Sequence, residues 1–156
     1  MAWSEVDLAK AIWTVPADRM KADANHIVPL APEAVAILES LPRWTGPFVF
    51  STTGGRRPIA NFSGIKEKFD ALMPGVESWR FHDLRRSMRT GLSALRIPDT
   101  VSELCIAHTQ KGLHKVYDRH AYIDEKRHAF EAWENHVLAI CEPGTPSNVI
   151  PIMARG

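Results

Sequence analysis

The stretch from residue 79 to residue 96 limits the possible folds most, because its polar and apolar residues separate at a helical spacing. At about 100° per residue, four polar residues share one face: His82, Arg85, Arg86 and Arg89. Four apolar residues share the other: Leu84, Met88, Leu92 and Leu95. Such a helix buries its apolar stripe and presents the histidine and the guanidinium groups. Because guanidinium groups are planar, permanently charged donors, this face suits a phosphate.

Two further reactive residues follow, His108 and Tyr117. We expect them on separate short helical segments with a break at Lys111-Gly112. A phenol is a nucleophile when a base or a positive site lowers the cost of the phenolate. Arginine, two histidines and a tyrosine are therefore a coherent set for attack on a phosphodiester. Tyr122 is the rival nucleophile, but it would project elsewhere if the helix continued, and the spacing from His108 favours Tyr117.

The order of these residues resembles the catalytic signature of the tyrosine recombinases, specifically the temperate-phage integrases. The matching pattern is His82-x-x-Arg85, then His108, then Tyr117 nine positions later. The residues from Tyr117 to Arg127, with Glu131-Ala132-Trp133, are similar to integrases of genomic islands and satellite phages. The resemblance covers almost the whole chain. The ordered set is specific, whereas His-x-x-Arg alone would be weak.

The resemblance implies a role for each catalytic residue. Tyr117 attacks a DNA phosphate and forms a 3′-phosphotyrosine, which the 5′-hydroxyl of the other strand later attacks. Arg85 and His108 stabilise charge on the phosphoryl oxygens, and His82 transfers a proton as base or acid. Lys21 matches the family's general acid, which protonates the leaving 5′-oxygen; the competing interpretation is an ordinary exposed loop lysine. No metal or other cofactor is required, because cations of the protein replace it.

One position departs from the family pattern. The glycine that usually precedes the second histidine is Ala107 here. Both residues permit close approach, so the change is small, but it weakens the assignment of His108.

The pattern of apolar residues predicts an α+β fold that is mainly α. The resemblance makes it the helical catalytic domain of the tyrosine recombinases, with a small antiparallel β-sheet. Alternation predicts paired strands at residues 11–16 and 26–30, and residues 48–50 are typical of a short buried strand. Helices are expected at residues 32–41, 61–73 and 124–140, with a further helix opened by Pro98 that leads to His108. The expected core faces of two of these helices are Phe62, Ile65, Phe69 and Leu72, and Phe130, Trp133, Val137 and Ile140.

The length of 156 residues fits one domain. We expect a catalytic domain at residues 1–142 and a linker and tail at residues 143–156, in which residues 148–153 form a candidate edge strand. By the resemblance, the family's first catalytic arginine and its N-terminal core-binding domain would precede Met1. The expectation is therefore an N-terminally truncated catalytic domain that folds but does not cleave DNA by itself.

Charge is concentrated around the candidate site. The net charge is only +1, yet residues 79–96 hold five Arg against one Asp, and residues 54–68 hold two Arg and two Lys against one Glu. Arg56 and Arg57 follow Gly54-Gly55 in a loop able to approach a DNA backbone. With Arg86 and Arg89 they are the candidate DNA contacts. The competing interpretation is that these are solvated faces and a flexible surface loop.

The resemblance implies double-stranded DNA attachment sites and other integrase protomers, in a tetrameric synapse, as partners. Hydrophobic residues make up 45% of the chain and charged residues 24%, as in ordinary soluble proteins. No apolar run approaches the ~20 residues of a membrane span, so no membrane partner is expected. The two cysteines, Cys105 and Cys141, show no pairing or zinc spacing. A reduced cytoplasmic protein, associated with the bacterial nucleoid, is the expectation.

Two other functions remain open at this stage. The first is a truncated integrase that binds DNA or its full-length relatives without cutting. The second is a metal-dependent hydrolase using His82, Asp83, His108, His114 and His120. Against the second, no histidine pair has the His-x-x-x-His spacing with a flanking glutamate.

Overall fold

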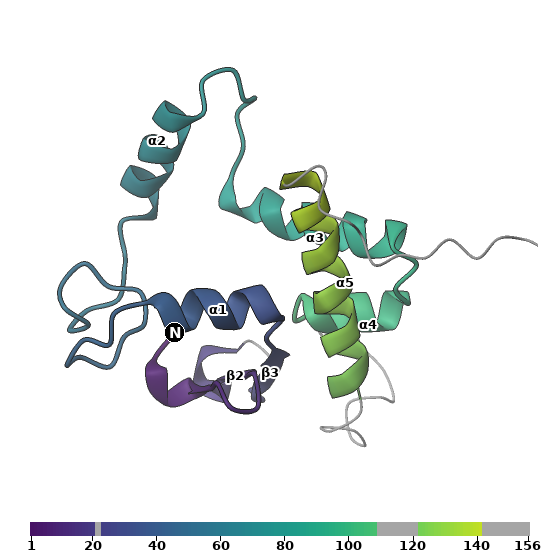
Figure 1. Ribbon diagram of the computed structural model, residues 1–156, viewed down its shortest axis with the longest axis horizontal. Coiled ribbons are helices and arrows are strands. Elements are labelled where there is room, and N and C mark those ends of the chain that lie inside the picture. Colours follow the sequence, from purple (N-terminus) through teal and green to yellow (C-terminus); the bar gives the residue numbers. More distant parts are fainter. Residues whose placement is uncertain (21–22, 109–121, 142–156) are drawn as a thin grey trace, which may run out of the picture.

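A three-stranded antiparallel sheet and five α-helices make up the described part of the chain, residues 1–20, 23–108 and 122–141 of a computed structural model (Figure 1). The predicted α+β, mainly helical class is confirmed. The strands are β1 (Val6–Asp7), β2 (Ile12–Val15) and β3 (His26–Pro29), with short 3₁₀ turns η1 (Trp3–Glu5) and η2 (Ala17–Arg19). The α-helices are α1 (Pro32–Ser40), α2 (Phe62–Leu72), α3 (Phe81–Ala94), α4 (Asp99–Cys105) and α5 (Ile123–Cys141).

The sheet confirms the predicted pair of strands and adds one. β2 pairs with β3 so that Trp13 lies opposite Val28, and β1 pairs with the other edge of β2. β1 was not predicted, because two residues are too few to show alternation. The strand predicted at residues 48–50 is wrong. Phe48 forms only an isolated bridge with Ala2, and Phe50 is 44% exposed, although Val49 is buried.

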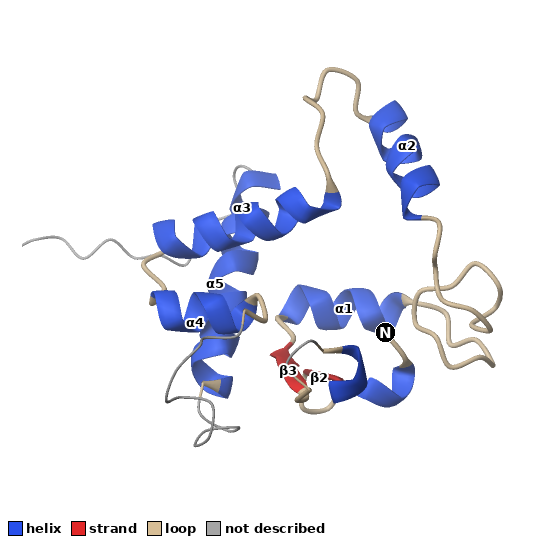
Figure 2. Cartoon of the chain, turned by 180° about the vertical axis from the view of Figure 1, so that it is seen from behind, coloured by secondary structure: helices blue, strands red, loops and turns tan. Residues whose placement is uncertain are grey.

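Two separate cores hold these elements. The first joins the sheet, α1 and the buried Val49 around Leu30 and Leu38. The second joins α3, α4 and α5 around Leu92, Val101 and Ala129. The view from behind in Figure 2 shows the sheet and α1 on one side and the α3–α5 bundle on the other.

Helix α2 belongs to neither core, and the prediction that its apolar face is buried is wrong. No residue of α2 is buried, and Phe62, Phe69 and Leu72 are 59%, 46% and 78% exposed. Figure 1 shows α2 standing apart from the other helices at the end of a long connection. Its 3.6-residue periodicity gave the helix correctly, but periodicity does not say whether a partner covers the apolar face.

The apolar stripe of α3 is buried along only part of its length. Met88, Leu92 and Leu95 pack in the core as predicted, whereas Leu84 is 58% exposed. The prediction is wrong at Leu84 because the first turns of α3 extend beyond α5 (Figure 1). On α5, Phe130 and Trp133 pack against the core as predicted, but Ile140 is 66% exposed.

Three side chains of α5 reach across to the N-terminal half. The Lys126 ammonium, on a residue only 8% exposed, donates to the backbone carbonyl of Ile27 in β3. Arg127 donates to the carbonyl of Lys10 at 3.3 Å. The Glu134 carboxylate accepts from the N–H of Glu33 at 2.6 Å, in the first turn of α1, where the N-cap Ala31 offers no side-chain acceptor. Polar contacts thus join α5 to the other core.

Several predicted features lie outside the described residues: Lys21, the Lys111-Gly112 break, Tyr117, the linker from residue 143 and the candidate edge strand at residues 148–153. Within the described ranges, no helix combines the length and the apolar character needed to cross a membrane.

Gly91 permits the close approach of α3 and α5. A Cβ atom added there would lie 2.0 Å from Cζ3 of Trp133, so Gly91→Ala forces the helices apart. We expect a loss of roughly 1–3 kcal/mol in the free energy of unfolding, although helix propensity alone favours alanine by about 0.5–1 kcal/mol. Urea denaturation measures the difference. Ser87→Ala, on the exposed side of α3, is the matched control, and a Gly91→Ala variant more stable than wild type would contradict the packing.

Candidate active site

The first turns of α3 carry His82 and Arg85. The start of the helix is stabilised at its N-cap, where the Asp83 carboxylate accepts a hydrogen bond from the backbone N–H of Arg80 at 2.9 Å. This hydrogen bond is the main reason that the pKa of Asp83 lies below its usual value. His82 is exposed and Arg85 is partly buried one turn further on. The first turns of α3 thus expose His82 and partly cover Arg85.

His108 is held at the end of α4 by a reversal of the backbone. Its N–H donates to the carbonyl of Glu103 at 2.9 Å, and the N–H of Ala107 donates to Leu104 at 3.2 Å. This pair of bonds is a Schellman motif, whose turning residue adopts the left-handed conformation and is usually glycine. Ala107 is this turning residue, with φ +54°. Glycine adopts such a conformation without steric cost, whereas in alanine it raises the free energy of the folded state by roughly 1–2 kcal/mol. The position that departs from the family pattern is therefore the one at which glycine would fit best.

The side chain of Glu103 links His108 to α3. His108 Nδ1 lies 2.5 Å from Glu103 Oε2, and Arg89 Nε donates to Glu103 Oε1 at 2.7 Å. The remaining nitrogens of Arg89 bind Asp99 at 2.8 Å and Ser93 at 2.6 Å. The hydrogen bonds from Arg89 and then His108 lower the pKa of Glu103. The hydrogen bonds that Arg89 donates to Glu103 and Asp99 raise the pKa of Arg89. Through Glu103, the cluster connects the second histidine to the helix that carries His82 and Arg85.

The four candidate DNA contacts fall into different surroundings. Arg86 is exposed and makes a 3.3 Å ion pair with Asp83, whereas Arg89 binds two carboxylates. Arg56 and Arg57 are exposed on the loop before α2. That loop lies at the end of α1 remote from the α3–α5 bundle (Figure 1), so the structure does not bring these two arginines to His82 and Arg85.

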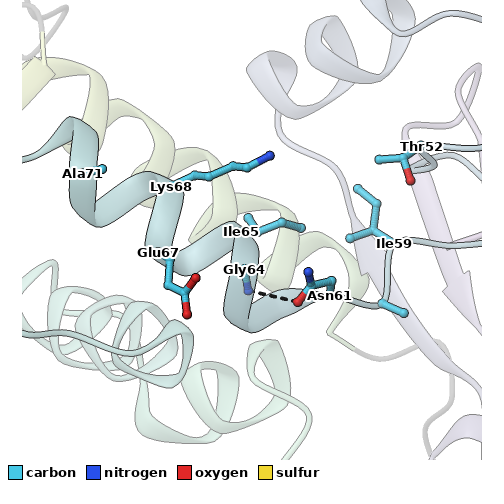
Figure 3. Close-up of a pocket in the computed structure, with 9 residues that line it drawn as sticks. Thr52, Ile59, Asn61, Gly64, Ile65, Glu67, Lys68 and Ala71 are labelled. Atoms are coloured by element: carbon cyan, nitrogen blue, oxygen red, sulfur yellow. Dashed lines mark hydrogen bonds between the residues drawn. The ribbon is translucent and has the colours of Figure 1, made fainter.

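A cavity of about 530 Å³ opens between that loop and α2, bordered by Thr52, Ile59 and residues of α2 (Figure 3). Its charged lining residues, Glu67 and Lys68, have opposite signs. Of the predicted catalytic residues, the three that the structure describes, His82, Arg85 and His108, do not line it. The cavity is therefore separate from the described part of the candidate active site.

The side chain of His26 in β3 lies near the positive charges of Lys126 and Arg85. Burial, together with the smaller effect of the positive charges of Lys126 and Arg85, lowers the pKa of His26 to about 4. Burial also lowers the pKa of Lys126 and raises that of its neighbour Cys105 to about 11. His26, Lys126 and Glu103 were not identified from the sequence. Glu103 precedes His108 by five residues, and a Schellman motif joins two residues at that spacing by a hydrogen bond. The contact between Glu103 and His108 could therefore have been predicted from the sequence.

The histidines do not assemble into a metal site in the described residues, where no three His, Cys, Asp or Glu side chains are placed to hold an ion. His114 and His120 of the hydrolase alternative lie outside the described residues.

Comparison with known proteins supplies the decisive observation. Prophage integrase IntA of Escherichia coli K12 is 31% identical over 141 residues, which cover 88% of this chain and 34% of that protein. Prophage integrase IntZ of the same organism is 30% identical over 143 residues, with 88% and 35% covered. The integrase of Shigella phage Sf6 is 27% identical over 138 residues, with 85% and 35% covered.

The chain belongs to the phage-type integrases. It spans about a third of the length of the curated integrases that it matches. No family model matches the chain. No solved structure matches it either. The similarity to IntA extends over almost nine-tenths of the chain.

The depressed pKa of His26 makes the stability of this integrase depend on pH. The folded protein holds the His26 proton less tightly than the unfolded chain, whose histidine titrates near its ordinary value of 6.5. Between pH 6.5 and about 4 the unfolded chain therefore binds more protons, and the free energy of unfolding falls as the pH falls. Above pH 6.5 this contribution is constant.

We expect His26→Gln to lose less stability than wild type between pH 7.5 and pH 4.5 in urea denaturation. His128→Gln, on the exposed side of α5, is the control for removing a histidine. Equal losses in wild type and His26→Gln would contradict the assignment.

Proposed function

We propose that this integrase breaks and rejoins DNA by the tyrosine recombinase reaction, through a 3′-phosphotyrosine formed on Tyr117, and that it corresponds to the C-terminal catalytic domain of that family. Phage or genomic-island integration and excision is the process that this reaction serves. The proposal rests on the motif His82-x-x-Arg85, His108, Tyr117 and on the similarity to prophage integrases. The observation that carries it is the Arg89–Glu103–His108 link, which fixes the second histidine relative to the helix of the first.

The proposed reaction is an in-line displacement at phosphorus. The Tyr117 oxygen forms a bond to phosphorus while the bond to the 5′-oxygen breaks. Lys21 supplies the proton that the leaving 5′-oxygen takes up, and His82 accepts the phenol proton. Arg85 and His108 donate hydrogen bonds to the non-bridging oxygens, on which negative charge accumulates. The 5′-hydroxyl of another strand then attacks the phosphotyrosine and releases Tyr117, so the phosphodiester count is unchanged.

Double-stranded attachment-site DNA is the proposed substrate, and further integrase protomers are the proposed partners, in the cytoplasm of the bacterial host. The exposed Arg56, Arg57 and Arg86 are the proposed contacts with the phosphate backbone. The second candidate is DNA binding without cleavage. The occupied guanidinium of Arg89 favours it in one respect, because Arg89 is not free to act as an additional phosphate ligand.

Covalent trapping tests the nucleophile. Residues 1–156 are assayed alone and in a chimera in which they replace the matching region of E. coli IntA, on a nicked duplex that carries the IntA attachment site. In the chimera we expect a covalent adduct that resists a denaturing gel, is lost in Tyr117→Phe and is kept in Tyr122→Phe. The assay of residues 1–156 alone tests the expectation that they do not cleave DNA by themselves. DNA affinity should change little in Tyr117→Phe, since only one hydroxyl is removed.

The chimera is first checked for folding by circular dichroism and for binding to the site. A folded, DNA-bound chimera that forms no adduct would favour the non-catalytic alternative. An adduct lost in Tyr122→Phe but not in Tyr117→Phe would reassign the nucleophile.

The two arginines on α3 should differ in their contribution to DNA binding. Arg86 is exposed, so Arg86→Gln should reduce the slope of log affinity against log salt by about one, as expected for one lost phosphate contact. Arg89→Gln should leave that slope unchanged, because Arg89 already neutralises Glu103 and Asp99. Fluorescence anisotropy at several salt concentrations measures both, and a larger change in Arg89→Gln would show that Arg89 binds DNA.

A further inference from the structure

Glu103 contacts His108 twice, and the two contacts come from different parts of the residue. The backbone carbonyl of Glu103 accepts the His108 N–H at 2.9 Å, and its carboxylate lies 2.5 Å from Nδ1. The first contact fixes where the histidine leaves α4. The second fixes the rotation of its ring. Together they leave the imidazole one orientation relative to the helix end.

The carboxylate is itself held at both oxygens. Oε1 accepts from Arg89 Nε and Oε2 lies against His108, so rotation of the carboxylate would break one contact or the other. Arg89 cannot follow such a rotation, because its other two nitrogens are bound to Asp99 and Ser93. Glu103 is also ionised at neutral pH, since the hydrogen bonds from Arg89 and His108 lower its pKa.

We propose that Glu103 is a positioning residue for phosphoryl transfer, which fixes the His108 ring so that Nε2 faces the phosphate, with Arg89 and Asp99 holding the carboxylate in place. The inference rests on the proposed function. A carboxylate only accepts hydrogen bonds, so the contact requires a hydrogen on Nδ1. Nε2, on the other side of the ring, then stays free, and in the protonated ring it donates to a phosphoryl oxygen without reorientation.

The variant Glu103→Gln distinguishes the proposed role, in which Glu103 orients the His108 ring, from a purely structural role in connecting α3 to α4. The glutamine oxygen still accepts from Arg89, so the helices stay joined. The glutamine NH₂ group is a donor and faces Nδ1, so it accepts no hydrogen bond from the ring. The neutral ring should therefore move its hydrogen from Nδ1 to Nε2 in the variant.

Nitrogen chemical shifts of the His108 ring, measured by NMR on residues 1–156, report the tautomer without DNA. We expect the neutral wild-type ring to carry its hydrogen on Nδ1 and the Glu103→Gln ring to carry it on Nε2. Glu39→Gln, on the exposed side of α1, is the matched control and should resemble wild type. A wild-type ring with its hydrogen on Nε2 would overturn the inference, whether or not the variant folds.

The IntA chimera supplies the functional measurement. Adduct formation at saturating DNA should fall about ten- to a hundredfold in Glu103→Gln, part of the roughly 10²–10³-fold that one positioned hydrogen-bond donor to the reacting oxygens contributes, while DNA affinity changes less than about twofold. Tyr117-dependent adducts at the wild-type rate in Glu103→Gln would overturn the inference alone. Adducts that persist in Tyr117→Phe would overturn the proposed function. The tautomer measurement, which needs no DNA, would then still test whether Glu103 orients the His108 ring.

Discussion

The position of the two cores relative to each other depends on the hydrogen bond that the buried ammonium group of Lys126 donates to β3. Taking an ammonium out of water is costly unless it is hydrogen-bonded, and Lys126 meets that requirement at the Ile27 carbonyl. β3 is therefore held against α5. Arg127 and Glu134 extend the junction along α5 to the turn before β2 and to the first turn of α1. Through this junction the bundle that carries Arg85 and His108 is placed against the hairpin whose connection contains Lys21.

The secondary structure could be predicted where the signal was local. The spacing of apolar residues predicts the helices at 32–41, 61–73 and 124–140 and the strands at 11–16 and 26–30. In the structure, the ends of each element differ from these predictions by no more than one residue. What covers each face is a property of the whole fold. The stripe on α3 predicted burial for Leu84, yet α5 crosses only the part of the helix where Gly91 admits Trp133. The equally regular stripe on α2 has no buried member.

The candidate site was predictable in its residue types and less so in its contacts. The resemblance supplied His82, Arg85 and His108, and the structure places them on α3 and at the end of α4. A helical projection of the sequence counted Arg89 with the exposed arginines, because it contains no information about α4. Only the turn at Arg96, which has φ +61° and brings α4 back along α3, places Asp99 and Glu103 against Arg89. His26 and Lys126 were missed because strand and helix residues a hundred positions apart give no local signal.

The three contacts from α5 to the other core share one property: each joins a side chain of α5 to a backbone group, the carbonyls of Lys10 and Ile27 and the N–H of Glu33. Every residue except proline offers both groups, so substitutions at positions 10, 27 and 33 need no matching change in α5. Correlated substitutions between sequences, which report side chains that must change together, would therefore leave this junction almost invisible. A designer who transplants α5 into another integrase would have to preserve the path of the backbone it contacts, rather than any particular residue there.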